Sequence, residues 1–315
     1  MFASSQGALA HPAASRGIPY SPRPMKSGSA QGVTAMFIAV AAFSFMDALL
    51  KLFAAHYPPL QVSALRALAS LPFVILPLLV QGRLAELKVR RVGLHLLRGL
   101  LGVVMLASFV YALAAAPLAS VYSIYMAAPL LIAALAAWWL GERADLGRWL
   151  AIIVGLIGVL VILQPRPGGL ALAAGIAASI SALCYALAVI TARVLTRSEN
   201  SPSMVFSFLL IVSVIAGGLA LPDWVPIRAG DWLLIAATGG LGAIGQHYIT
   251  EAFRHAPAAV VAPIEYTALL WGVGIDWVFW QVLPDGVILS GAGIIIAAGA
   301  YVAWREKITA THGSP

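Results

Sequence analysis

The sequence predicts an all-α integral membrane protein with ten transmembrane helices, arranged as an inverted repeat of two five-helix units. Three observations predict this fold. The chain of 315 residues is 61% hydrophobic and only 10% charged, whereas a soluble domain averages roughly 25% charged residues. Ten apolar runs follow one another with short connections, each near the ~20 residues that cross a bilayer. The two halves of the chain match at a constant offset of 140 residues.

The ten apolar runs define the predicted helices. Pro117 separates the third run from the fourth, because proline interrupts a helix. Without this break the two runs would form one segment of more than 45 residues, which is far too long for one crossing. The predicted spans are 33–53, 60–80, 93–114, 118–140, 149–165, 169–192, 203–222, 232–253, 257–280 and 286–304.

The internal repeat predicts how the helices are related. The matches least expected by chance in so apolar a chain involve glycine, proline and aspartate. Each copy holds five helices, and an odd number gives the two copies opposite orientations in the membrane, as in many secondary transporters. The matched pairs are Gly99 with Gly239, Gly102 with Gly242, Pro117 with Pro257 and Asp145 with Asp285.

Basic residues in the connections predict the topology. Fourteen lie on the side of the N-terminus, and only Arg166 and Arg228 lie on the opposite side. Cytoplasmic loops carry the excess of Lys and Arg, so we expect both termini in the cytoplasm. Since the basic residues lie between apolar runs, the net charge of +7 indicates topology and not a nucleic-acid partner.

The motifs of several other protein classes do not occur in this sequence. There is no P-loop, no HExxH and no GxSxG pattern, so we expect neither ATP use nor enzymatic activity. Cys184 is the only cysteine, which excludes an intrachain disulfide. We predict no cofactor and no bound metal. A membrane enzyme and a non-transporting scaffold remain distant alternatives, because intramembrane charges of both signs are costly for a scaffold.

An ordered series of short motifs resembles a known family. The motifs are Phe43–Lys51, Arg66, Arg98–Gly102, Ala114–Ala119, Pro129, Leu140–Arg143 and Gly158–Val159. In this order they resemble the drug/metabolite transporter superfamily, EamA type, over residues 33–305. The second copy departs from the pattern, since Trp280–Leu283 stands where the first has Leu140-Gly141-Glu142-Arg143.

The resemblance implies a ten-helix permease with a central cavity and alternating access. It divides the chain into a disordered cytoplasmic tail (1–32), EamA-like repeat 1 (33–165), EamA-like repeat 2 (169–305) and a cytoplasmic tail (306–315). The tail at 1–32 is rich in Ala, Ser, Gly and Pro, a composition typical of disorder. The implied location is the bacterial inner membrane.

The implied function is secondary active transport of small organic metabolites, such as amino-acid-like zwitterions or cations, with export favoured by family analogy. An uptake permease for a vitamin or nucleoside-like compound, such as riboflavin or S-adenosylmethionine, is the alternative. Protons are a candidate coupling ion, and a homodimer is one candidate assembly. The lipid bilayer and the small-molecule substrate are the expected partners.

Two opposite charges form the first candidate site. Asp47 and Arg66 each lie about 9 Å below the outer face, counted at about 1.5 Å per residue. We expect them to pair or to bind a zwitterionic substrate together; a purely structural ion pair is the alternative. Lys51 lies four residues after Asp47 on the same helix face and could compete for it, or extend to the interface.

A second candidate cluster lies nearer the cytoplasm. Glu265 is expected about 12 Å and His247 about 9 Å from that face. Together they could couple a proton to transport or bind an amine, whereas a structural hydrogen bond is the alternative. Tyr125 is the repeat equivalent of Glu265, and Tyr122 and Tyr266 are candidates to line the cavity.

Asp276 lies in a stretch rich in tryptophan near the outer end of the ninth run. Trp271, Trp277 and Trp280 accompany it, and tryptophan at this level usually forms an interfacial belt. We therefore expect Asp276 at the outer mouth.

Overall fold

The structure, a computed structural model, describes residues 28–139, 146–164, 171–196, 198–256 and 258–312. Within these ranges all regular structure is helical, and no strand occurs. The predicted tail before residue 28, the motif at 140–143 and Pro257 of the predicted repeat lie outside the described residues.

Each predicted span coincides with helix, but two terminal helices are longer than predicted. The first helix begins at Gly28 and the last continues to His312, because good helix formers such as Ala30 and Lys307 flank the apolar runs. The long helices are α1 (Gly28–Ala54), α2 (Pro59–Val80), α3 (Val92–Ala115), α6 (Leu146–Leu163), α7 (Leu172–Leu195), α8 (Ser201–Ala220), α9 (Asp231–His255) and α12 (Gly286–His312). The short elements are η1 (Leu84–Leu87), α4 (Leu118–Tyr125), α5 (Ala128–Trp139), η2 (Leu221–Asp223), α10 (Ala258–Val261), η3 (Ala262–Thr267), α11 (Ala268–Ile275) and η4 (Asp276–Trp280).

Among the described residues, eight helical stretches are long and apolar enough to cross a membrane. This confirms a multi-pass membrane protein. The stretch Leu118–Trp139, which contains α4 and α5, is one of the eight, and Pro117 precedes it as predicted. Helix α9 is long but carries the polar residues Gln246 and His247, and it is not among the eight.

The ninth predicted run is not one continuous helix, contrary to the sequence-based expectation. It is divided into α10, the 3₁₀ segment η3, α11 and the π-helical turn η4. Pro263 lies at the start of η3 and removes a backbone donor that a regular helix would use. Gln281 ends the run with φ 55°, a left-handed conformation that is uncommon for a residue other than glycine.

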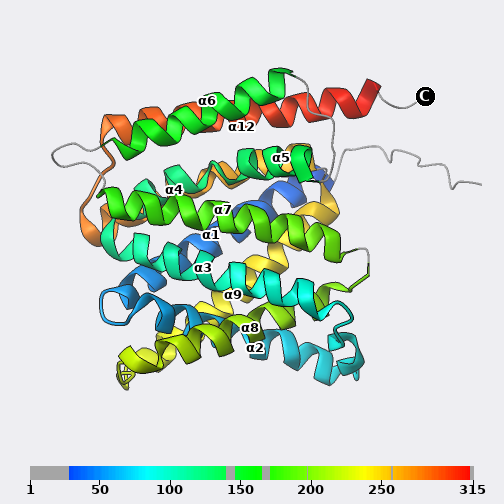
Figure 1. Cartoon of the computed structure of the whole chain (residues 1–315), viewed down its shortest axis with the longest axis vertical. Helices are drawn as coiled ribbons and strands as arrows, with labels where there is room; N and C mark the ends of the chain where they lie inside the picture. Colours follow the sequence, from blue (N-terminus) through cyan, green and yellow to red (C-terminus); the bar gives the residue numbers. More distant parts are fainter. Residues whose placement is uncertain (1–27, 140–145, 165–170, 197, 257, 313–315) are drawn as a thin grey trace, which may run out of the picture.

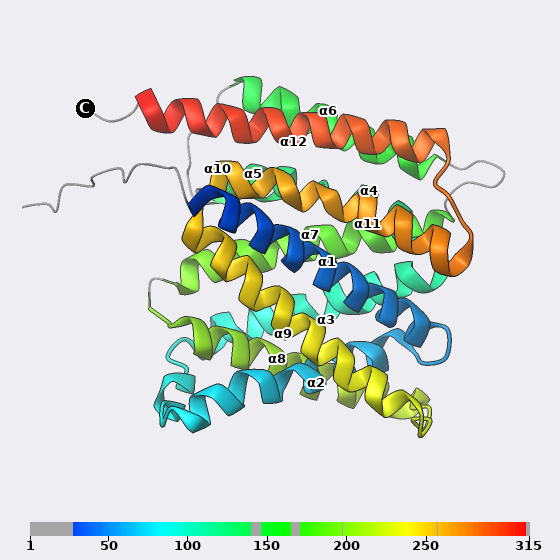
Figure 2. The ribbon, with the colours of Figure 1, turned by 180° about the vertical axis from the view of Figure 1, so that it is seen from behind.

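The helices lie side by side in one bundle (Figure 1). Helices α6 and α12 pack together as an outer pair, and α4 with α5 lies between this pair and the rest of the bundle. Seen from behind, α10 and α11 run alongside α4 and α5 (Figure 2). The start of α1 and the end of α12 lie at the same end of the bundle (Figure 2). We call this the N-terminal end, and the opposite end the α1–α2 end.

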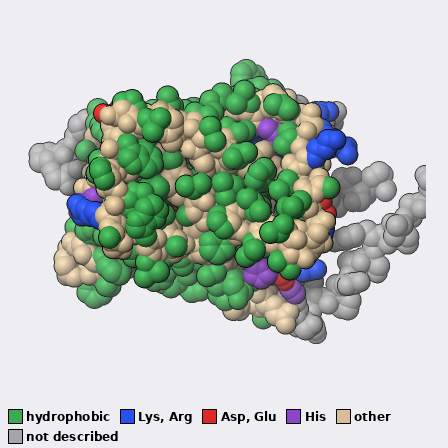
Figure 3. All heavy atoms as spheres, turned by 90° about the horizontal axis from the view of Figure 1, so that it is seen from below, with side chains coloured by type: hydrophobic (Ala, Val, Ile, Leu, Met, Phe, Trp, Pro, Cys, Tyr) green, Lys and Arg blue, Asp and Glu red, His purple; other side chains and the backbone are tan. Residues whose placement is uncertain are grey.

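Long helices from the two halves of the chain pack against one another. Helix α1 packs mainly on α9, and α3 packs mainly on α7. Helix α2 contacts both α8 and α9, while α8 contacts both α2 and α3. The face of the bundle seen in Figure 3 is apolar in its middle, with Lys and Arg side chains at its ends. This distribution is typical of a protein surrounded by lipid.

A polar junction fastens the loops at the α1–α2 end. The buried Gln61 side chain donates to the Val225 carbonyl (2.6 Å) and accepts from the Val225 N–H (3.0 Å). The Tyr57 hydroxyl donates to Asp231 Oδ2 (2.5 Å) and accepts from the Arg228 N–H (3.1 Å). The α1–α2 turn is therefore tied to the segment that precedes α9.

A similar junction fastens the loops at the N-terminal end. Glu199 Oε1 accepts from the backbone N–H groups of Arg90 (2.8 Å) and Arg91 (2.7 Å), and His95 Nε2 lies 3.5 Å away. Burial acts to raise the pKa of Glu199, but the two N–H donors and His95 outweigh it, so the pKa lies below its usual value. The α7–α8 loop is therefore tied to the start of α3.

Gly239 marks a close approach of α9 to α2. A Cβ atom at Gly239 would overlap the Ala69 carbonyl group, whereas one at Gly240 would lie 3.7 Å from Phe73. We expect Gly239→Ala to lower the free energy of unfolding by about 1–3 kcal/mol, the usual cost of overpacking. Gly240→Ala is the matched control, since its added methyl group meets only ordinary contacts. Thermal unfolding in detergent compares them, and equal melting temperatures would contradict the prediction.

Candidate functional site

Asp47 and Tyr122 form the centre of the site. Asp47 lies on α1 with 8% of its surface exposed, and Tyr122 lies on α4 with 6% exposed. The Tyr122 hydroxyl donates to Asp47 Oδ2 at 2.9 Å. Since a carboxylate has further lone pairs, Asp47 can accept from a second donor.

Arg66, on α2, supplies a positive charge next to Asp47. The two side chains attract each other electrostatically, but no ion pair within 4.0 Å joins them among the described residues. Arg66 is half-buried, and no hydrogen bond from its guanidinium is found in the described part of the chain. Its five N–H donors are thus available to a ligand.

Lys51 and Asp276 form an ion pair that the sequence reasoning did not find. Lys51 Nζ lies 2.9 Å from Asp276 Oδ1 and 4.4 Å from the centre of the Trp280 ring. The other carboxylate oxygen, Oδ2, accepts from the Ala119 N–H at 2.8 Å. Asp276 is fully buried, so its carboxylate is held inside the bundle by these two partners and is not open to solvent.

This pair could have been found by comparing depths. Lys51 and Asp276 lie near the ends of two runs that cross in the same direction, so both are close to the α1–α2 end. The depth estimate that related Asp47 to Arg66 applies equally to these two charges. The tryptophan residues around Asp276 favoured the interfacial interpretation instead.

An aromatic group extends from this centre toward the N-terminal end. The Tyr125 ring lies 5.5 Å from the Phe109 ring and 5.4 Å from the Tyr185 ring. Tyr185, on α7, is 36% exposed and is a further candidate that the sequence reasoning missed. No charge or repeat match singled it out.

Glu265 and Tyr266 lie on the 3₁₀ segment η3. Glu265 is exposed, and it interacts electrostatically with Tyr185 and Tyr266. Tyr266 is half-buried, and its hydroxyl packs against Gly299 of α12. Glu265 therefore belongs with the aromatic group and not with the buried ion pair.

His247 is exposed on α9, where its ring lies 5.3 Å from the Tyr248 ring. No hydrogen bond or ion pair between His247 and Glu265 is found among the described residues. The structure thus does not bring the two members of the second predicted cluster into direct contact. Among the residues that the structure describes, no three His, Cys, Asp or Glu side chains lie close enough together to hold a metal ion.

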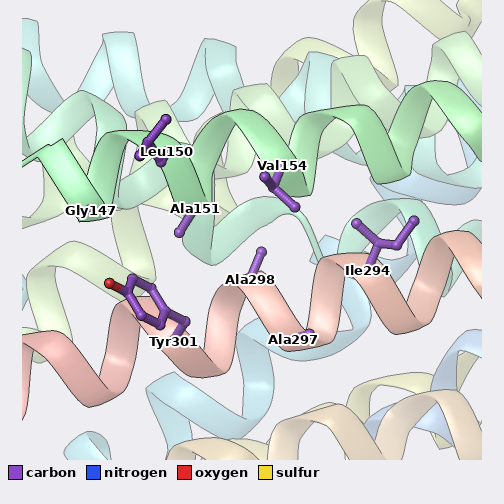
Figure 4. Close-up of a pocket in the computed structure, with 8 residues that line it drawn as sticks. All are labelled: Gly147, Leu150, Ala151, Val154, Ile294, Ala297, Ala298 and Tyr301. Atoms are coloured by element: carbon purple, nitrogen blue, oxygen red, sulfur yellow. The ribbon is translucent and has the colours of Figure 1, made fainter.

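Apolar grooves also lie on the surface of the described bundle, and two of them are well defined. The larger, about 440 Å³, runs between α6 and α12 and is lined mainly by aliphatic side chains, with Tyr301 at one end (Figure 4). The smaller, about 270 Å³, is lined by α1 residues such as Phe45 together with Phe279 and Trp280. Grooves of this kind can accommodate lipid chains.

Comparison with known proteins identifies the family. Residues 30–164 match the model of the EamA-like transporter family. A riboflavin transporter of Rhizobium johnstonii is 31% identical over 232 residues, which cover 73% of this chain and 76% of that protein. The pseudopaline exporter CntI of Pseudomonas aeruginosa is 29% identical over 275 residues, covering 87% and 95%.

A solved crystal structure has the same fold. It superposes with a TM-score of 0.59 at 19% identity and covers 91% of this chain and 99% of that one. This agreement extends the likeness across both halves of the chain. With its apolar helical bundle and these relatives, the chain belongs to the EamA-like transporter family, of the drug/metabolite transporter superfamily.

Proposed function

We propose that this protein is a secondary active transporter that exports small organic metabolites, in particular amino-acid-like zwitterions or cations. One observation carries the proposal: Asp47 and Arg66 are opposite charges inside membrane-spanning helices, yet no ion pair joins them within 4.0 Å. Ionisable groups in the membrane interior are costly and usually serve a substrate or ion pathway. A zwitterion would place its amino group at Asp47 and its carboxylate at Arg66.

The proposed mechanism is alternating access by an inverted repeat with ten crossings. The offset of 140 residues relates α1 to α7 and α3 to α9. This relation maps the contact between α1 and α9 onto the contact between α7 and α3, and both contacts are extensive, which supports the proposal. The two polar junctions lie at corresponding places, since Arg91 corresponds to Asp231 and Glu199 to Pro59, which lies between Tyr57 and Gln61.

We further propose that the protein lies in the bacterial inner membrane with both termini in the cytoplasm. The excess of basic residues at the N-terminal end supports this orientation. The α1–α2 end then faces outward, and Asp276 with Lys51 lies near the outer face. The two repeats extend over 33–165 and 169–305.

Glu265 is the proposed coupling group on the cytoplasmic side. Its exposure on η3, beside Tyr185 and Tyr266, would let it meet a proton or a substrate amine from the cytoplasm. Tyr122, Tyr125 and His247 remain proposed contributors to the pathway. A carboxylate that exchanges protons would link transport to the pH gradient.

Uptake of a vitamin-like compound is the second candidate function. The 31% identity to a protein named as a riboflavin transporter favours it. The row of aromatic rings formed by Phe109, Tyr125 and Tyr185 could stack on a flat heterocycle. Export keeps precedence by analogy with the relative named as a pseudopaline exporter, and Asp47 and Arg66 suit a small zwitterion.

The test is uptake and counterflow in proteoliposomes, with a panel of labelled amino acids, amines and riboflavin, with and without a pH gradient. We expect saturable counterflow of a zwitterion by the wild-type protein and loss of at least about 30-fold in Asp47→Asn, the effect of removing one charged partner. Glu265→Gln should keep counterflow but lose the response to the pH gradient. Full activity of Asp47→Asn would contradict the proposed site.

A further inference from the structure

Lys51 has two carboxylates in its neighbourhood, those of Asp276 and Asp47. Asp276 holds it now, at 2.9 Å. Asp47 lies four residues earlier on α1, and side chains at this spacing are neighbours on a helix face. Lys51 has a long side chain with a flexible four-carbon stem, which gives its ammonium a wide range of positions on this face of α1.

The Lys51–Asp276 pair closes the bundle at the outer end. Asp276 joins three elements, because it binds Lys51 of α1 and the Ala119 N–H at the start of α4 from its own place on η4. It is fully buried, and the Lys51 side chain is only 12% exposed. Any opening between α1 and η4 at this end must therefore break the pair.

The segment that carries Asp276 is irregular. It is a π-helical turn, and the following residue, Gln281, has φ 55°. Single-turn π segments occur frequently at functional sites. The ninth run is thus more easily rearranged at this end than the regular helix α1 opposite it.

The charged side chains of this region are two cations and two anions. Lys51 and Arg66 are positive, and Asp47 and Asp276 are negative. Tyr122 donates a hydrogen bond to Asp47 and interacts electrostatically with Asp276. A buried cation left without a counter-charge is strongly destabilised. When η4 moves away, Asp47 is the acceptor that can take Lys51, whereas Asp276 would reach water.

We propose that Lys51 exchanges between Asp276 and Asp47: it pairs with Asp276 when the outer side is closed and with Asp47 when the outer side is open. This rests on the proposed function, in which Asp47 binds the cationic group of the substrate. Lys51 then competes with the substrate for Asp47 as the outer side opens. The exchange thereby lowers the affinity of the outward-open state for the substrate and eases its release to the outside.

The test measures access from outside and needs no substrate. The reporter is Ser120→Cys in a Cys184→Ala background, which removes the only native cysteine. Ser120 follows Ala119 and is 1% exposed, and no hydrogen-bond partner of its hydroxyl is found among the described residues. Replacing the hydroxyl by a thiol therefore breaks no hydrogen bond. Intact cells are treated with a membrane-impermeant maleimide, and the rate of labelling is measured. A cysteine at the exposed His56 is the positive control.

Removal of the Asp276 carboxylate and removal of the Asp47 carboxylate should change the labelling rate in opposite directions. A minor state is commonly populated at 0.1–10%, so loss of the closing pair in Asp276→Asn should raise the labelling rate about tenfold or more. Asp47→Asn removes the partner of Lys51 in the open state, and should lower the rate about threefold or more below wild type. Lys51→Met should resemble Asp276→Asn, and Lys51→Arg should resemble wild type.

Two results would overturn the proposal. An unchanged rate in Asp276→Asn would mean that this pair does not close the outer side. A rate in Asp47→Asn equal to or above wild type would leave Lys51–Asp276 a static pair. Each variant is first checked for wild-type elution on gel filtration in detergent. Because labelling requires no substrate, failure of the transport assay is distinguishable from failure of the exchange.

Discussion

Replacing Asp276 by alanine is expected to lower the free energy of unfolding by about 3–5 kcal/mol, the range for removing one partner of a buried ion pair. The fully buried carboxylate holds the Lys51 ammonium at 2.9 Å and the Ala119 N–H at 2.8 Å. Its loss leaves a buried cation without a counter-charge and a helix N–H without an acceptor. The melting temperature in detergent measures the effect.

Asp223→Ala is the matched control for this prediction. Asp223 is exposed at the same end of the bundle, and such surface substitutions usually change stability by less than about 0.5 kcal/mol. The double variant Lys51→Met/Asp276→Leu should recover more than half of the lost stability, because apolar groups can replace a buried ion pair. Equal melting temperatures for Asp276→Ala and Asp223→Ala would contradict the assigned role of the pair.

Replacing Arg66 by glutamine is expected to have the opposite profile, with a large loss of transport and little loss of stability. No hydrogen bond or ion pair of its guanidinium is found among the described residues, so the folded bundle loses little when the charge is removed. A substrate carboxylate would lose a charged partner, which typically costs 2–5 kcal/mol. We therefore expect counterflow of a zwitterion to fall about 100-fold, with the melting temperature unchanged or higher.

Arg98→Gln provides the contrast. Arg98 also lies inside a span, but it donates to the Met204 carbonyl at 2.7 Å and stacks 4.7 Å from the centre of the Phe208 ring. Its removal should lower the melting temperature and leave the substrate preference unchanged. If Arg66→Gln lowered stability as much as Arg98→Gln while transport stayed intact, Arg66 would be a structural residue.

The sequence alone determined the all-helical, multi-pass membrane class and most helix limits. Hydropathy reports whether a segment prefers lipid, and ten runs of spanning length leave few other arrangements. Pro117 marked the break before α4, because proline acts on the local backbone. The rarity of charges inside apolar runs likewise pointed to Asp47 and Arg66 without knowledge of the packing.

Only the tertiary structure decided which charges meet. Counting residues along a helix gives the depth of a side chain, but not the direction in which the helix presents it. Rotation of α1 in its packing on α9 turns Lys51 toward Asp276, 225 residues away in sequence. The same limitation explains why Tyr185 was missed beside Tyr125, and why η3 was expected as regular helix. The sequence determines which segments are apolar and long enough to enter the membrane, whereas helix rotation and packing decide the partners within the bundle.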